Sequence, residues 1–207
     1  MHLVFLTIIF LLLISLSSFL IGIGVTRWIV FLLMVLIYFA LLIGPTMWYT
    51  YKSNSMKGIG RFLKVYKNKP LYAYPYLTAH GNETEIKESL RKILSKYQQS
   101  SIQHTYGAIL AILEKDLQKL KEQAEQIGTE PLQSYYLAYH AILKQKFNQA
   151  EEWKSKINEP WMIHALNALT AKEQGDSETF KHEAEEAVRL TRGVQKYSLY
   201  YSFKRLG

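Results

Sequence analysis

The chain has 207 residues, with 25 Lys and Arg, 17 Asp and Glu, and no cysteine. The lack of cysteine excludes disulfide bonds, thiolate metal sites and cysteine nucleophiles. The net charge of +8 is unevenly placed, because residues 1–69 hold seven cationic and no acidic residues, whereas residues 70–207 hold 18 cationic and 17 acidic ones. This basicity is local, so the composition does not indicate a nucleic-acid partner.

Two uncharged apolar stretches open the chain, at about residues 3–25 and 28–50. A helix of about 23 residues is roughly 34 Å long, enough to cross a hydrocarbon core of about 30 Å. The link around Arg27 is too short for anything but an antiparallel hairpin. We therefore predict two transmembrane helices within residues 1–51. An alternative is a signal peptide cleaved after Ser15-Leu16-Ser17, in which case the second stretch would still anchor the chain.

Basic residues follow the second stretch. The segment 52–69 holds six cations, and the link between the two stretches holds only one. Because basic flanks stay in the cytoplasm, we predict a multi-pass plasma-membrane protein with both its N-terminus and its C-terminal domain in the cytoplasm. The cysteine-free composition, rich in Lys, Ile and Tyr, favours a bacterial cell membrane. The six cations are Lys52, Lys57, Arg61, Lys64, Lys67 and Lys69.

Neither apolar stretch contains a charged residue. Transport and proton relay need ionisable groups at membrane depth, so we expect the two helices to serve as an anchor. Their small and hydroxyl-bearing residues are typical of helix packing inside a membrane.

The basic segment 52–69 has helical periodicity, with its cations opposite an apolar face. One interpretation is that it lies among anionic lipid head groups with that face turned to the bilayer. The other is that its charges only set the topology, with Gly58 and Gly60 forming a flexible joint. The apolar face consists of Ile59, Phe62, Leu63 and Tyr66.

Residues 70–207 carry helical periodicity throughout and no strand pattern. Asn82 and Glu85 predict a capping box, and Ser177 is the expected N-cap of a later helix. Turns near residues 81, 115, 145 and 175 recur about every 30–34 residues, which is typical of stacked helix–turn–helix units. We predict helix pairs at 70–80/83–97, 101–113/116–127, 131–145/148–157 and 160–174/178–191, and a closing helix at 194–205.

The stretch from Ser134 to Ala150 resembles the tetratricopeptide repeat family. Leu137 and Ala138 match the Leu–small pair of its first helix, and Phe147 and Ala150 match the aromatic residue and the Ala that follow the turn. The next unit places Ala168, Gly175 and Ala187 at similar positions. The resemblance implies an all-α fold, in which a TPR-like α-solenoid over residues 70–207 follows the transmembrane hairpin.

In such a solenoid, the first helix of each pair lines a concave groove that binds a partner. The tyrosines are notable because Tyr combines apolar area with a polar tip, as recognition surfaces require. The alternative is that tyrosines fill the core between helices, which we expect of the out-of-phase Tyr136. The resemblance places at or beside the groove Tyr135, Tyr139, His164, Leu169 and Lys172.

No motif for catalysis is found. The six histidines lack metal-site spacing, and neither a phosphate-binding Gly-rich loop nor a nucleophile motif occurs. We therefore expect no enzymatic activity, no cofactor and no metal site. The favoured hypothesis is a membrane-anchored scaffold or adaptor that binds a protein partner at the cytoplasmic face. The alternative is an accessory subunit or assembly factor of a larger membrane complex, docked through its transmembrane hairpin.

Overall fold

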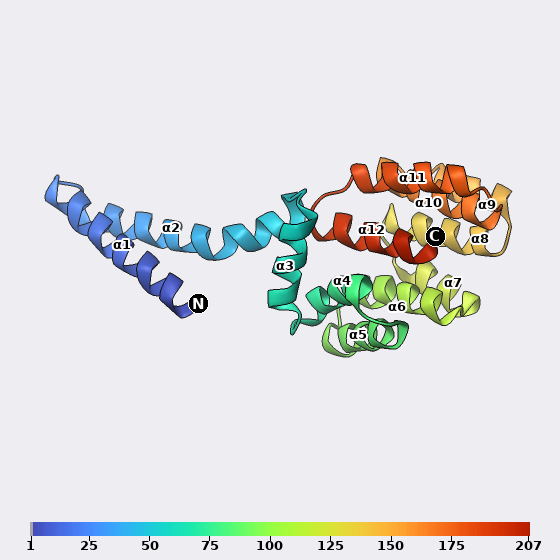
Figure 1. Cartoon of the computed structure of the whole chain (residues 1–207), viewed down its shortest axis with the longest axis horizontal. Helices are drawn as coiled ribbons and strands as arrows, with labels where there is room; N and C mark the ends of the chain where they lie inside the picture. The colour runs from blue at the N-terminus through green and yellow to red at the C-terminus, as the bar shows by residue number, and fades with distance from the viewer. Residues whose placement is uncertain (1) are drawn as a thin grey trace. The chain divides into compact units, whose positions relative to one another are not determined.

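The computed structural model describes residues 2–207, with the side chains of residues 11–41 and 43–207 (Figure 1). This part of the chain contains twelve α-helices, one π-helical turn and no strand, so the all-α prediction is confirmed. The chain divides into two units: the first ends at Trp48, and the second, called the helical unit below, spans Tyr49–Gly207.

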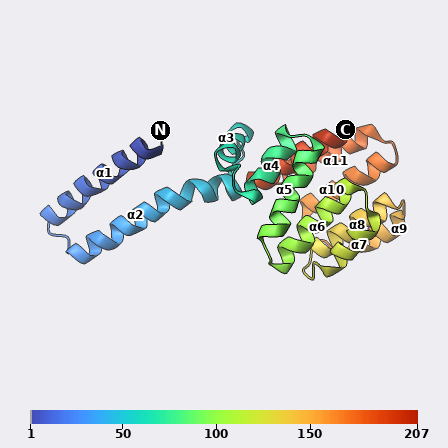
Figure 2. The ribbon, with the colours of Figure 1, turned by 90° about the horizontal axis from the view of Figure 1, so that it is seen from below.

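The first unit consists of two helices, α1 (His2–Gly22) and α2 (Arg27–Met47), which run antiparallel (Figure 2). By length and composition, one helix in the described residues is able to cross a membrane: Arg27–Lys52, with a mean hydropathy of 2.6. Signal sequences and the core helices of soluble proteins have the same composition. Among the residues described with their side chains, α1 contributes the shorter apolar stretch Leu11–Gly22.

A π-helical turn, Trp48–Lys52, leads into the helical unit. The helices that follow are α3 (Met56–Tyr66), α4 (Pro70–His80), α5 (Glu83–Lys96), α6 (Ser100–Glu114), α7 (Leu117–Gln126), α8 (Leu132–Leu143), α9 (Phe147–Lys154), α10 (Pro160–Glu173), α11 (Ser177–Arg189) and α12 (Gly193–Leu206). From α4 onward, the helices begin and end within three residues of the predicted bounds, because their caps and turns are encoded locally.

Three turns in the helical unit share one geometry and are evenly spaced along the chain. Lys115, Gln145 and Gly175 each have a φ between 56° and 77°, the left-handed conformation that ends a helix. The N–H of the following residue donates to the carbonyl of an alanine five positions earlier, at 2.8–2.9 Å. These alanines are Ala111, Ala141 and Ala171, so the turns are Schellman motifs with a common period.

Of the two predicted N-caps, one is confirmed and one is wrong. Asn82 and Glu85 form the expected capping box, in which each side chain accepts from the other residue's backbone N–H, at 2.9 and 2.8 Å. The prediction that Ser177 caps α11 is wrong. Asp176 is the cap: its carboxylate accepts from the N–H of Thr179 at 3.0 Å. Because Gly175 already ends the preceding helix, the next helix begins one residue earlier than expected.

The core of the helical unit is a series of clusters. Most clusters join helices that are neighbours along the chain, such as α6, α7 and α8, or α8, α9 and α10, and one joins α3 with α12. Ala108, Ala138 and Ala168 are fully buried, and small side chains allow adjacent helices to approach closely. Each helix pair therefore buries apolar side chains against the pair next to it.

Helix α3 does not fit the first of the two interpretations, in which its apolar face meets lipid. Ile59, Phe62 and Leu63 are buried inside the helical unit, where they pack around Tyr197 of α12. Gly58 and Gly60 lie within α3, so they form no joint between segments. A Cβ at Gly60 would lie 3.3 Å from the Tyr197 hydroxyl, so this glycine permits the close packing of α3 on α12.

The closing helix α12 returns to the start of the helical unit. It packs against α11, which precedes it, and also against α3 and α4 (Figure 1). The first and last helices of the helical unit are therefore joined, and α12 faces the helices between them.

Candidate binding cavity

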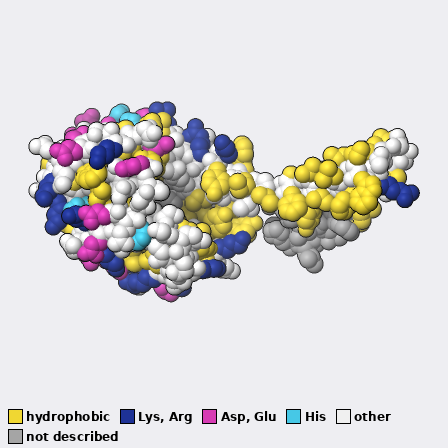
Figure 3. Space-filling view, turned by 180° about the vertical axis from the view of Figure 1, so that it is seen from behind, with side chains coloured by type: hydrophobic (Ala, Val, Ile, Leu, Met, Phe, Trp, Pro, Cys, Tyr) yellow, Lys and Arg dark blue, Asp and Glu magenta, His cyan; other side chains and the backbone are white. Residues whose placement is uncertain are grey.

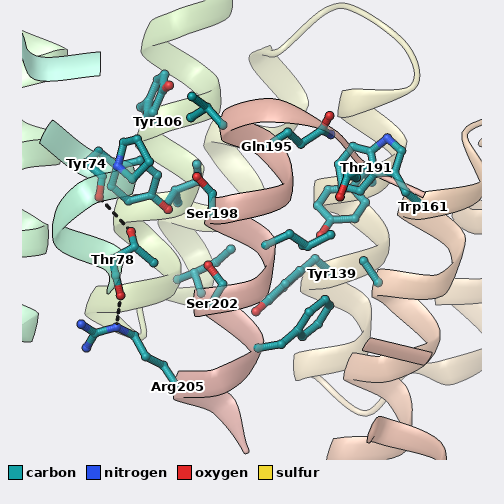
Figure 4. Close-up of a pocket in the computed structure, with 18 of the residues that line it drawn as sticks. Tyr74, Thr78, Tyr106, Tyr139, Trp161, Thr191, Gln195, Ser198, Ser202 and Arg205 are labelled. Carbon is teal, nitrogen blue, oxygen red and sulfur yellow. Dashed lines mark hydrogen bonds between the residues drawn. The ribbon is translucent and has the colours of Figure 1, made fainter. Parts of the chain in front are cut away.

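A cavity of about 750 Å³ lies along one side of α12. Its other walls come mainly from α4, α6, α8 and α10, the first helix of each predicted pair. Figure 4 shows α12 between the helix that carries Tyr74 and Thr78 and the helices that carry Tyr139 and Trp161. This volume is within the range of about 300–1,000 Å³ that is typical of ligand pockets.

One wall of the cavity is aromatic. Tyr74 of α4 and Tyr106 of α6 contact each other edge to face, with ring centroids 5.9 Å apart. Tyr135 of α8 contacts both Tyr139, at 6.3 Å, and Trp161 of α10, at 5.8 Å. These contacts link rings from successive helices, so the wall presents apolar area with phenol hydroxyls at its surface.

The wall formed by α12 is more polar. Gln195, Ser198 and Ser202 recur at intervals of three and four residues, which places them on one face of the helix. Leu199 and Phe203 line the cavity beside them. A ligand in this space would meet rings on one side and hydroxyl and amide groups on the other.

Burial controls the protonation of the aromatic wall. It raises the pKa of Tyr139 to about 12, and the Glu173 carboxylate adds to the rise. It also raises the pKa values of Tyr74, Tyr106 and Tyr135 above that of a free tyrosine. In the described part of the chain, the hydroxyls of Tyr106, Tyr135 and Tyr139 have no hydrogen-bond partner in the protein. They are available to a ligand or to water.

Three contacts distributed along α12 hold it in place. At its start, the N–H of Gly193 donates to the carbonyl of Ser53 at 2.8 Å. In its middle, the Tyr197 hydroxyl and His80 Nε2 form a hydrogen bond of 3.2 Å. Near its end, the Arg205 guanidinium donates to the last carbonyls of α4, including that of Thr78 at 2.5 Å. A cation at a helix C-terminus is favourable, so Arg205 also complements the dipole of α4.

The structure brings together three of the five residues predicted for the groove. Tyr135, Tyr139 and Leu169 all line the cavity. Tyr136, which lies out of helical phase with Tyr135 and Tyr139, is buried in the core between α6, α7 and α8 as expected. It is also one of the residues that line the cavity.

The other two residues predicted for the groove do not line the cavity. His164 Nδ1 lies 2.7 Å from the Glu183 carboxylate of α11, on the side of α10 turned to its pair helix. The Lys172 ammonium contacts the backbone carbonyl of Leu206. Both side chains therefore have intramolecular partners.

Sequence reasoning missed part of the cavity. Tyr74 and Tyr106 are on its aromatic wall, and α12 forms the opposite wall. The available signals were the tyrosines of the first helix and the helical spacing of Gln195, Ser198 and Ser202.

The six cations of the segment 52–69 lie apart from the cavity lining, and all are exposed. Within the described residues, no group of three or more His, Asp or Glu side chains is placed to hold a metal ion. No protein-family model, curated protein or solved structure matches this chain.

Proposed function

We propose that this protein is a membrane-anchored adaptor, in which a TPR-like helical unit at the cytoplasmic face of a bacterial cell membrane binds a segment of a partner protein. The observation that carries the proposal is the cavity of about 750 Å³, with its aromatic wall and its free tyrosine hydroxyls. Tyrosine is enriched where proteins recognise one another, because it supplies large contact area at low conformational cost.

The anchor is supported by the helix Arg27–Lys52. Its 26 residues correspond to about 39 Å, longer than the hydrocarbon core of about 30 Å. Only 6% of its most apolar window is buried, so most of its large apolar side chains, such as Trp28, Phe31 and Phe39, face outward. Six cations lie at or after the end of this helix, from Lys52 to Lys69, against Arg27 alone at its start, and this imbalance favours a cytoplasmic helical unit.

The TPR-like arrangement is supported by the three Schellman turns. The same turn geometry recurs at equal intervals, next to buried alanines with the same spacing, and such recurrence is the signature of a repeated helix pair. In this arrangement the cavity lies on the side lined by the first helices, where the resemblance to tetratricopeptide repeats implies binding.

The mechanism is recruitment. A partner held by a tethered unit has a higher effective concentration at the membrane, without any chemical step. Helix α12 sets the specificity, since its polar stripe faces the rings across the cavity and restricts which segment fits.

The test is photo-crosslinking in intact membranes, with a photoreactive amino acid replacing Tyr139 in the cavity. The same replacement at Tyr200 is the matched control, because that tyrosine is on α12, outside the cavity lining, and 43% exposed. We expect a discrete protein adduct at Tyr139 that is absent at Tyr200. It should also disappear when Ser202→Trp fills the cavity. Equal labelling at both tyrosines, or an adduct that survives Ser202→Trp, would refute the binding role of the cavity.

The second candidate is an accessory subunit or assembly factor of a larger membrane complex. It is favoured by the first unit, where Val30 is the one buried side chain among those described. Such exposed helices are suited to packing on partner helices. A photoreactive residue at Ser17 distinguishes the two, since a partner captured mainly there would identify the hairpin as the interface.

A further inference from the structure

The cations of the segment 52–69 are separated from every acidic residue. The ion pairs formed among the described residues all lie between Glu83 and Arg189, where acidic and basic residues are mixed. None of the six cations takes part in one, and residues 1–69 contain no carboxylate side chain. This surface therefore keeps an uncompensated positive charge.

Packing gives the charge a defined direction. Ser55 caps α3 by accepting from the N–H of Gly58 at 3.1 Å, and Ile59, Phe62 and Leu63 attach the helix to Tyr197. With its apolar side covered, α3 presents its exposed cations outward on a helix of fixed position. These cations are Lys57, Arg61 and Lys64.

The outward surface also includes apolar groups. Val65 of α3, next to Lys64 in the chain, is 63% exposed. Figure 3 shows Lys and Arg side chains beside an apolar surface patch on the helical unit. Cations flanking a small apolar surface are typical of proteins that rest on the head-group region of a bilayer.

The chain keeps α3 close to the end of the apolar helix. Lys52 ends the helix that we propose to span the membrane, and Met56 begins α3. Four residues reach at most about 14 Å. This is comparable to the distance of about 8–10 Å over which charges act at ordinary salt concentrations.

We propose that the cationic face of α3, together with Lys52, Lys67 and Lys69, binds the anionic phospholipid head groups of the bilayer in which the chain is anchored. This proposal rests on the membrane anchor of the proposed function. It differs from the sequence-based interpretation because the contact is electrostatic and the apolar face of α3 does not insert. Since Tyr197 joins α3 to α12, the contact also orients the wall of the cavity relative to the membrane.

Removing charge should weaken the contact strongly. Each cation near an anionic surface contributes about a fivefold increase in association, so three substitutions should lower the equilibrium constant for docking roughly a hundredfold. The variant is Lys57→Gln/Arg61→Gln/Lys64→Gln. Its matched control is Lys144→Gln/Lys146→Gln/Lys181→Gln, which removes three exposed cations that form no ion pair in the described structure.

The experiment uses the full chain in nanodiscs. Because the sequence has no cysteine, Val65→Cys accepts a single donor fluorophore, and acceptor lipids report its distance from the bilayer. We expect greater energy transfer with a mixture of phosphatidylglycerol and phosphatidylcholine than with phosphatidylcholine alone. We also expect the difference to vanish at high salt and in the α3 variant, but to persist in the matched control.

The possible negative results distinguish an error in the α3 contact from an error in the membrane anchor. Equal transfer in neutral and anionic nanodiscs, or loss of the difference in both triple variants, would overturn the α3 contact and leave the anchor standing. A label that responds to added polyglutamate but not to phosphatidylglycerol would assign the surface to an acidic protein, and would also overturn it. Failure of the wild-type chain to enter nanodiscs would overturn the anchor, and the α3 contact with it.

Discussion

Tyr197 is the buried side chain of α12 that contacts α3, so Tyr197→Ala is a sharp test of the fold. Tyr197 is 2% exposed and is the largest fully buried side chain among the described residues. It packs among Ile59, Phe62 and Leu63, and its hydroxyl bonds to His80 at 3.2 Å. No other residue of α12 belongs to the buried part of this cluster.

The expected loss of stability follows from these contacts. Truncating a buried aromatic residue to alanine typically costs about 3–5 kcal/mol. The hydrogen bond alone contributes about 0.5–1.5 kcal/mol, which is the loss expected for Tyr197→Phe. For a chain of this size, the alanine variant should lower Tm by about 6–20 °C, because each 1 kcal/mol corresponds to roughly 2–4 °C.

The assay is thermal unfolding of the full chain in nanodiscs, followed by circular dichroism, with hydrogen exchange of α3 measured in parallel. Tyr200→Ala is the matched control on the same helix, since that side chain is 43% exposed and should cost less than about 1 kcal/mol. We expect the amides of Met56–Tyr66 to lose protection in the Tyr197 variant only. Equal melting temperatures for the two alanine variants, or unchanged protection of α3, would refute the docking of α3 on α12.

Two further predictions concern the start of α12 and the aromatic wall. Gly193→Ala should destabilise the chain strongly, because Gly193 has a φ of +57° and a Cβ there would overlap the carbonyl group of Thr50. Gly175→Ala, at a φ of +77° with open space around it, should cost only the backbone strain of about 1 kcal/mol. Phenol absorbance in the ultraviolet should show Tyr139 ionising near pH 12 rather than pH 10. Because the folded chain holds this proton more tightly than the unfolded chain, its contribution to stability is constant below about pH 10 and is lost as the pH rises toward 12.

A specific result would contradict each of these predictions. Similar melting temperatures for the two glycine variants would mean that the start of α12 is not packed against Thr50. A titration curve in which Tyr139→Phe removes a phenol of ordinary pKa would mean that this side chain is solvated and that the aromatic wall is open.

The structure places three of the five residues predicted for the groove on the cavity and two away from its lining, for a physical reason. Tyr135 and Tyr139 are one helical turn apart on α8, so helical periodicity alone places them on one face. His164 was assigned by resemblance, and the deciding factor was the Glu183 carboxylate of α11, which holds it on the opposite side of α10. The spacing of residues within one helix gives no information about which side chain of a neighbouring helix will pair with His164.

What the sequence by itself determined was the all-α content, the ends of the helices and the even spacing of the turns. These depend on interactions between residues close together in the chain, such as the Asn82 capping box and the Schellman bonds to Ala111, Ala141 and Ala171.

Only the tertiary structure decided that the apolar face of α3 turns inward and that α12 borders the cavity. The decisive contacts join residues far apart, such as Tyr197 with His80, 117 positions away. Whether such residues meet depends on the small rotations accumulated from one helix pair to the next, and these arise from packing that no short segment of sequence encodes.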